Sequence, residues 1–197
     1  MKKLVVYIHG AGGSTAEATH YQRLFPDSEV IGYDYCSQTP WDAINEFGPF
    51  FEKLIPKYDS AILIANSIGA FFALHALSSV HFDRAYLISP VVDMEKLITN
   101  MMQWSGVTEK DLAEKGIIHT NFGQELSWDY LTWVRTHPIV WNCPTAILYG
   151  SLDNMQSMDS ICRFAEDCGA SVTVMENGEH WFHTDEQMEF LDQWMRN

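Results

Sequence analysis

The chain has 197 residues, 47% of them hydrophobic, and its 26 Asp and Glu outnumber 12 Lys and Arg to give a formal net charge of −14. This length and composition predict one globular domain with a substantial buried core. The negative charge argues against nucleic acid and anionic membrane surfaces as partners, because both attract basic proteins.

The sequence gives no sign of a leader, a membrane span or a metal site. Only five apolar residues precede His9, too few for the core of a signal peptide, and no segment has the roughly 18–20 apolar residues of a membrane span. The four cysteines form no CxxC pair and have no zinc-like spacing. We therefore expect reduced thiols in a cytoplasmic protein.

Short apolar runs alternate with helix-like segments along most of the chain. Strands are predicted at 4–8, 29–33, 60–65, 84–88, 145–149 and 171–175, and helices at 16–24, 41–55, 68–77, 155–167 and 184–195. Strands that alternate with helices predict an α/β fold, with a mostly parallel sheet of about six strands and helices on both faces.

One region, 94–142, interrupts this alternation between the fourth and fifth strands. It is too long for a structureless loop and predicts a cap insertion of two or three helices within a single domain spanning 1–197. Four tryptophans lie in it: Trp104, Trp128, Trp133 and Trp141. They either pack the insertion onto the sheet or form an aromatic lid over a site, and the sequence leaves both interpretations open.

Polar residues follow several predicted strands. They are, in chain order, the segment His9–Gly13, then Ser67, Asp93, Asp153 and His180. The carboxyl ends of parallel strands share one edge of a sheet, where ligands of open α/β folds bind. A serine nucleophile needs a base, the base needs an orienting acid, and acyl transfer needs N–H donors for the oxyanion. Each of these parts is present at a strand end.

Other roles compete for the same residues. Ser67 and Asp153 also suit the N-terminal caps of the helices that follow them. Asp93 is a rival for the acid and His183 a rival for the base. We interpret His9 as a structural hydrogen-bonding residue rather than as a base.

Four segments together resemble the α/β-hydrolases, specifically a small serine hydrolase or esterase with a short helical cap. HGAGG, at 9–13, resembles the oxyanion loop of that family, and ANSIG, at 65–69, its nucleophile elbow. LYGSLDNM and ENGEHWFH resemble its acid and histidine loops. The likeness spans residues 4 to about 195 outside the insertion. It departs from the family pattern at Ala65, where glycine is common.

The resemblance implies a role for each matching residue. Ser67 would be the nucleophile, His180 the base and Asp153 the acid. The backbone N–H groups of Ala11 and Ile68 would form the oxyanion hole, with Gly12 as a further candidate. The candidates for contact with the substrate are Trp128, Trp133 and Asn66.

The sequence therefore predicts a serine hydrolase that cleaves a small ester-like acyl substrate through an acyl-enzyme, without cofactor or metal. Thioester hydrolysis and cofactor-free perhydrolysis on the same triad are alternatives. A binding protein that keeps the hydrolase fold without turnover is another. The substrate and the oligomeric state cannot be read from the sequence.

Overall fold

The computed structural model describes residues 1–196 and divides the chain into two compact units. The sheet unit comprises Met1–Val92 and the chain from Val140 onward, and the inserted unit comprises Asp93–Ile139. Each is described by itself below.

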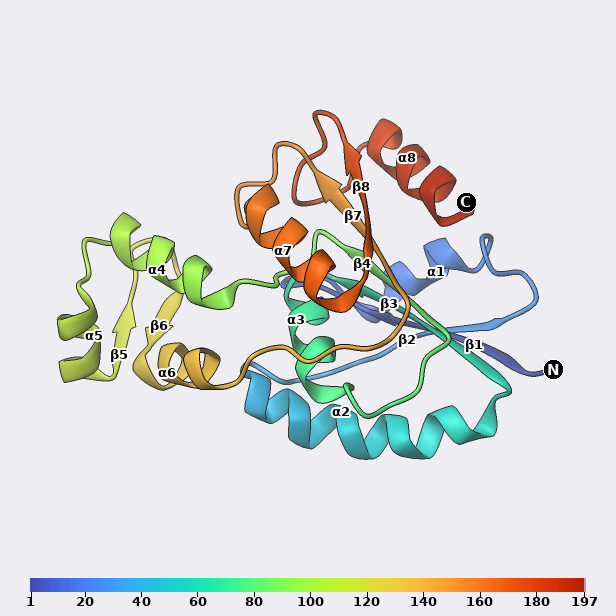
Figure 1. Cartoon of the computed structure of the whole chain (residues 1–197), viewed down its shortest axis with the longest axis horizontal. Helices are drawn as coiled ribbons and strands as arrows, with labels where there is room; N and C mark the ends of the chain where they lie inside the picture. Colours follow the sequence, from blue (N-terminus) through green and yellow to red (C-terminus); the bar gives the residue numbers. More distant parts are fainter. Residues whose placement is uncertain (197) are drawn as a thin grey trace. The chain divides into compact units, whose positions relative to one another are not determined.

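The sheet unit is built on a parallel sheet with the strand order β2-β1-β3-β4-β7-β8 (Figure 1). Its strands are β1 (Lys3–Ile8), β2 (Glu29–Gly32), β3 (Ser60–Asn66), β4 (Arg84–Ile88), β7 (Thr145–Gly150) and β8 (Ser171–Met175). The predicted α/β class and the parallel sheet of about six strands are confirmed. The central strands β1, β3 and β4 are mostly apolar between their ends because helices cover the sheet on both faces.

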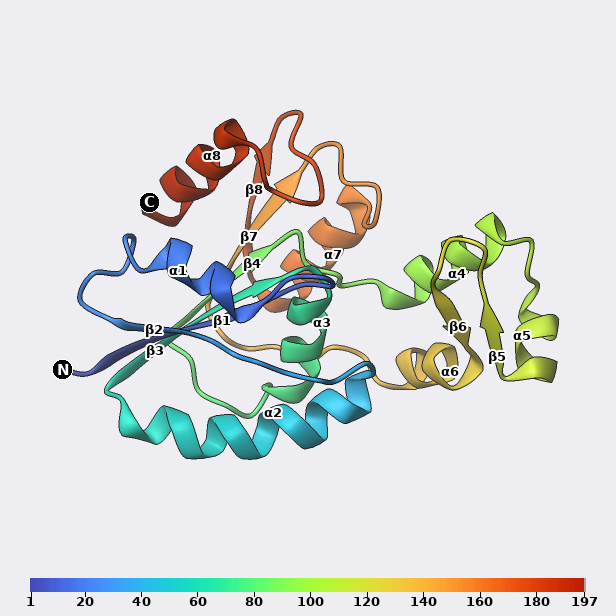
Figure 2. The ribbon, with the colours of Figure 1, turned by 180° about the vertical axis from the view of Figure 1, so that it is seen from behind.

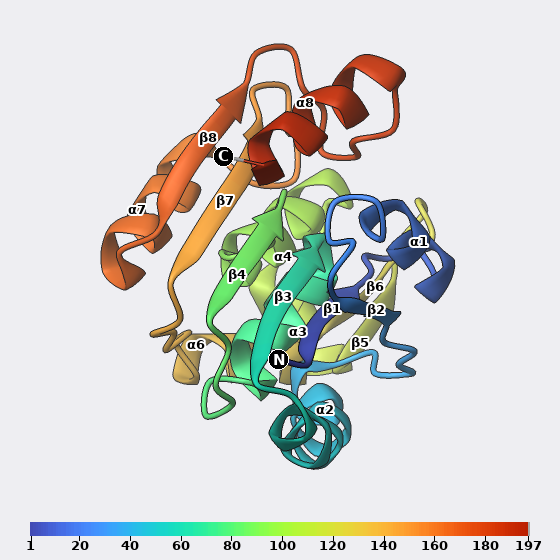
Figure 3. The same cartoon turned by 90° about the vertical axis from the view of Figure 1, so that its right-hand side faces the viewer.

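Five α-helices flank this sheet, two on one face and three on the other (Figure 3). One face carries α1 (Ala18–Tyr21) and α8 (Asp185–Arg196), and the other carries α2 (Pro40–Leu54), α3 (Ser67–Ala76) and α7 (Met158–Cys168). Alternate strand residues such as Tyr7 and Ile64 pack toward α1 and α8. Both faces are therefore buried, and polar side chains gather at the strand ends.

The segment predicted as a helix at 16–24 is helical only up to Tyr21, in two short pieces. A short 3-10 helix, η1 (Thr15–Glu17), leads into α1, which has only four residues. Turns follow, and Pro26 cannot continue a helix because it lacks a backbone N–H. The prediction of one continuous helix there is wrong, because the chain must turn back to enter β2.

The inserted unit contains α4 (Met94–Trp104), α5 (Glu109–Lys115) and α6 (Trp128–Thr136). It also contains an antiparallel hairpin of β5 (Ile117–His119) and β6 (Glu125–Ser127), around which the three helices gather (Figure 2). Because of this hairpin the insertion is not purely helical, as the sequence had predicted it to be.

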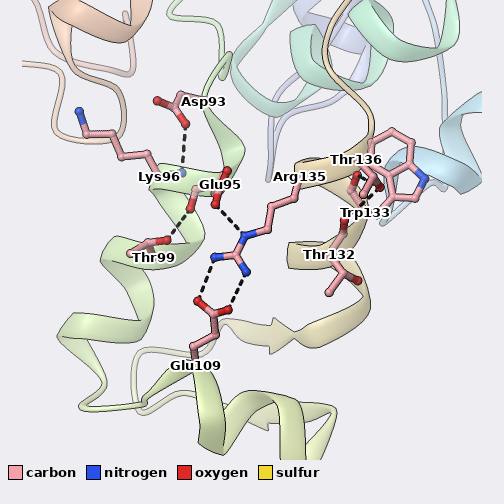
Figure 4. A network of polar contacts seen from close by, with 9 residues as sticks. All are labelled: Asp93, Glu95, Lys96, Thr99, Glu109, Thr132, Trp133, Arg135 and Thr136. Carbon is pink, nitrogen blue, oxygen red and sulfur yellow. Dashed lines mark hydrogen bonds and ion pairs between the residues drawn. The ribbon is translucent and has the colours of Figure 1, made fainter.

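A single arginine links the three helices of the inserted unit. From α6, the guanidinium of Arg135 donates to Glu95 of α4 at 2.7 Å and to both carboxylate oxygens of Glu109 of α5, at 2.7 and 2.9 Å (Figure 4). A fork-like guanidinium suits such paired contacts. Trp141, which the sequence grouped with the insertion, is buried in the sheet unit and donates to Thr145 at 2.8 Å.

No helix within residues 1–196 is long and apolar enough to cross a membrane. All four cysteines have free thiols: Cys36, Cys143, Cys162 and Cys168.

The beginning of α3 lies very close to the chain that follows β1. A Cβ atom added to Gly69 would lie 2.1 Å from the carbonyl oxygen of His9. Any side chain at this position would therefore force the two backbone segments apart.

We expect Gly69→Ala to lower the free energy of unfolding by about 3 kcal/mol, because the added methyl group has no space. Gly12→Ala is the matched control, since Gly12 has a φ of +74° but nothing within 4 Å of an added Cβ atom. Its cost should be limited to backbone strain of about 1 kcal/mol. Denaturant unfolding of both variants measures the difference, and equal losses would contradict the steric explanation.

Candidate active site

Ser67 occupies a strained turn between β3 and α3. Its φ of 52° is positive, which is uncommon for a residue with a side chain. Its carbonyl oxygen accepts a hydrogen bond from the backbone N–H of Val91, beyond β4, at 3.2 Å. A Cβ atom on Gly10 would lie 3.0 Å from the Cβ of Ser67, so the loop after β1 also closes on the serine. Two segments, which follow the neighbouring strands β1 and β4, therefore hold this turn.

The structure brings Ser67, His180 and Asp153 together in one chain of hydrogen bonds. The Oγ of Ser67 lies 2.8 Å from Nε2 of His180, and Nδ1 of His180 lies 2.7 Å from Oδ2 of Asp153. A carboxylate accepts but does not donate, so the proton of a neutral His180 lies on Nδ1. Nε2 then has a lone pair for the hydroxyl proton of Ser67, as a general base requires.

The carboxylate of Asp153 is fully buried and well satisfied. Its side chain has no exposed surface, and its second oxygen, Oδ1, accepts from the backbone N–H groups of Met155 and Gln156 at 2.7 and 3.0 Å. These bonds fix the carboxylate and offset the cost of burying its charge. The Asp153 side chain is therefore held in position to orient the imidazole.

A cavity of about 290 Å³ opens beside the serine, within the sheet unit. It is lined by Gly10, Ala11, Gly12, Gly13, Glu17, Asn66, Ser67, His180 and Trp181. Two of the three proposed oxyanion donors, Ala11 and Gly12, thus lie in the cavity wall. The third, Ile68, is the second residue of α3, where backbone N–H groups have no partner within the helix. A helix N-terminus also favours negative charge.

The rival residues have other contacts. His183 stacks on Trp181, with ring centres 4.3 Å apart, and its Nδ1 lies 2.8 Å from the carbonyl oxygen of Trp181. Asp93 caps α4 by accepting from the backbone N–H of Lys96 at 3.1 Å (Figure 4). His9 stacks on Tyr35 with ring centres 4.5 Å apart. The hydrogen-bonded chain that starts at Ser67 thus runs through His180 and Asp153.

Of the predicted substrate contacts, Asn66 lies in the cavity wall. Trp128 and Trp133 belong to the inserted unit, where Trp133 stacks on His137 with ring centres 4.2 Å apart. Their contact with substrate stays a prediction.

The sequence reasoning missed two residues of the cavity wall, Glu17 and Trp181. The position of Trp181 directly after His180 was a usable signal. Glu17 gave none, because it belongs to the short 3-10 helix η1 and follows no predicted strand.

No protein-family model and no curated protein matches this sequence. Solved structures do resemble it. A hydrolase from Agrobacterium vitis S4, described as putative, has a TM-score of 0.78 at 16% identity, and the match covers 99% of this chain and 87% of that one. Est1E from Butyrivibrio proteoclasticus has a TM-score of 0.76 at 14% identity, and the match covers 99% of this chain and 86% of that one. Mouse alpha/beta hydrolase domain-containing protein 10 has a TM-score of 0.71 at 16% identity, and the match covers 98% of this chain and 87% of that one.

These matches span almost the whole chain, and the resemblance inferred from the sequence motifs is thereby confirmed at the level of the fold. The chain has the α/β-hydrolase fold. Since one fold hosts many activities, function is argued below from the site itself.

The loop after β1 is anchored by a half-buried phenol. The hydroxyl of Tyr35 donates to the carbonyl oxygen of His9 at 2.8 Å. Burial, and then the negative charges of Glu17 and Glu46, raise the pKa of Tyr35 to about 12. This anchor therefore keeps its proton throughout the neutral and mildly alkaline range.

The same pKa predicts an alkaline loss of stability. An unfolded chain releases the phenolic proton near pH 10 (about the unperturbed pKa), whereas the folded chain holds it until about pH 12. The contribution of Tyr35 to stability is thus complete below about pH 10 and is lost as the pH rises to about 12. Unfolding free energies of the wild type and Tyr35→Phe, compared at several pH values, should show the wild type losing more. A pH-independent difference would contradict the assignment.

Proposed function

We propose that this protein is a serine hydrolase that cleaves small ester-like acyl substrates through Ser67, His180 and Asp153. The observation that supports this most directly is the 2.8 Å contact between the Ser67 hydroxyl and Nε2 of His180, on a strained turn beside an open cavity. A serine used only as a helix cap needs neither the imidazole nor the positive φ. Similarity to known hydrolases and esterases in fold agrees with the proposal.

In the first half of the proposed reaction, Oγ of Ser67 attacks the substrate carbonyl while Nε2 of His180 takes the hydroxyl proton. A new C–O bond forms, and the electron pair of the carbonyl moves to its oxygen. The N–H groups of Ala11 and Ile68 would bind this oxyanion, with Gly12 as a further donor. Asp153 stabilises the imidazolium. The tetrahedral intermediate then collapses, and the imidazolium gives its proton to the leaving alcohol.

In the second half, a water molecule takes the place of the alcohol. His180 accepts a proton from the water as its oxygen attacks the acyl carbonyl. A second tetrahedral intermediate forms in the same oxyanion hole. Its collapse releases the acid and returns the proton from His180 to Oγ of Ser67. This sequence uses only groups of the chain, the substrate and water, and its proton transfers balance.

The cavity wall favours small esters over acyl groups on a phosphate-bearing carrier. Among the described residues that line it there is no lysine or arginine. Phosphate groups are usually bound by such cations, and the formal net charge of −14 opposes them further.

A fluorophosphonate probe should label Ser67, because the probe reacts with a serine that a neighbouring base activates. Mass spectrometry of the digested protein locates the label. Ser67→Ala should abolish labelling while leaving the melting temperature close to that of the wild type. Labelling of another serine, or none on folded protein, would overturn the nucleophile assignment and favour a binding protein.

Two aspartate variants test the acid. Asp153→Asn should lower kcat for an activated ester by about 10⁴, because an amide can no longer hold the productive tautomer of His180. Asp93→Asn is the matched control, with the same loss of charge at the helix cap of α4, and should change kcat by less than about tenfold. The opposite ranking would move the acid to the segment after β4.

A further inference from the structure

Glu17 contributes a carboxylate to the wall of the cavity beside Ser67. The proposed mechanism has no role for it, because the base, the acid and the oxyanion donors are all assigned. A negative charge near a developing oxyanion repels it and opposes the proposed reaction. Glu17 at this position is therefore expected to serve another purpose.

Hydrogen bonds within the protein occupy only some of the acceptor sites of this carboxylate. Oε1 accepts from the backbone N–H of Ser14 at 3.1 Å, and Oε2 accepts from the hydroxyl of Tyr7. Each carboxylate oxygen has about two lone-pair sites, so each has one left. The residue is exposed, and these sites are accessible to a ligand in the cavity.

Glu17 has no ion-pair partner among the residues that the structure describes. Within residues 1–196 no lysine, arginine or histidine forms an ion pair with it. Its charge also contributes to the raised pKa values of Tyr7, Tyr21 and Tyr35, after the larger effect of burial in each case.

An indole lies in the same cavity wall. Trp181 is 67% exposed although it stacks on His183. The face of an exposed indole attracts cations, and tryptophan is the strongest aromatic residue in this respect. A carboxylate together with an indole is a pair of groups suited to an ammonium ion.

We propose that the cavity selects esters that carry an ammonium group, with Glu17 as the residue that determines this specificity and Trp181 as a second contact. The inference rests on the proposed hydrolase function and specifies its substrate class. A neutral ester of the same shape would leave the remaining acceptor sites of the carboxylate without a partner when water is displaced, and it should react more slowly.

The first test compares two acetate esters of the same shape. Acetylcholine, the acetate ester of choline, carries a quaternary ammonium group, and 3,3-dimethylbutyl acetate has a neutral carbon in its place. Acid release in a pH-stat gives kcat/KM for each. We expect the wild type to prefer the cationic ester by about fivefold or more, in line with one partly exposed charge contact. A ratio of one or less would overturn the proposal.

Glu17→Gln removes the charge and keeps the size of the side chain. It should reduce the preference for the cationic ester to near one. Glu52→Gln is the matched control, since Glu52 is an exposed residue of α2 and its loss changes the net charge equally. Glu52→Gln should retain the wild-type preference. If it loses the preference too, long-range attraction rather than Glu17 is responsible, and the proposal fails.

A purely structural role of Glu17 gives a different result. If the carboxylate only holds the turn, Glu17→Gln should slow both esters and fluorophosphonate labelling by the same factor and leave their ratio unchanged. That outcome would also overturn the proposal.

A binding measurement separates this inference from the hydrolase function. Phenyltrimethylammonium needs no turnover, and calorimetry should show that it binds the wild type at least about fivefold more tightly than Glu17→Gln. If no ester is cleaved and no serine is labelled, but this difference is found, the hydrolase proposal fails and the cation site stands. If labelling succeeds without a difference in binding, the cation site fails alone.

Discussion

The contact between the backbone of Gly69 and the carbonyl oxygen of His9 sets the geometry on which the site depends. It holds the beginning of α3 against the loop after β1, leaving no space for a side chain. Ser67 lies two residues earlier, and its positive φ is maintained because this contact and the hydrogen bond from Val91 fix both sides of the turn. The nucleophile candidate and the loop with the proposed oxyanion donors are consequently positioned by the same crossing.

A second close contact positions Asp153 and His180. A Cβ atom on Gly150, at the end of β7, would lie 2.4 Å from the carbonyl oxygen of Gly178, and the backbone N–H of Leu152 donates to that oxygen at 2.8 Å. The loops after β7 and β8 are thus joined by their backbones immediately before Asp153 and His180. The distance between carboxylate and imidazole is therefore set by backbone packing rather than by flexible side chains.

Some elements and site residues could be predicted from the sequence and others could not, depending on whether a local pattern of residues marks them. The strands of the sheet were predictable because burial on both faces makes them nearly continuous apolar runs, as in Leu4–Ile8. The hairpin of β5 and β6 was not, since strands of three residues have too few positions to show alternation. The proximity of Ser67, Asp153 and His180 could be predicted because each follows a strand, and parallel topology gathers strand ends. Glu17 was not predicted as a cavity residue because its place there depends on tertiary packing.

Glu17 shows that one side chain can serve the fold and the cavity together. Its hydrogen bonds to Ser14 and Tyr7 fix the turn that leads from the loop after β1 into α1, and they do so through one lone pair of each oxygen. Glu17 also lines the cavity, and none of the residues given for the cavity wall is a lysine or an arginine. The formal net charge of −14 attracts cations to the protein from a distance, but it is screened by salt beyond about 10 Å. Discrimination between a cationic ligand and a neutral one must therefore come from a charge within the cavity itself, and Glu17 is the residue placed to provide it.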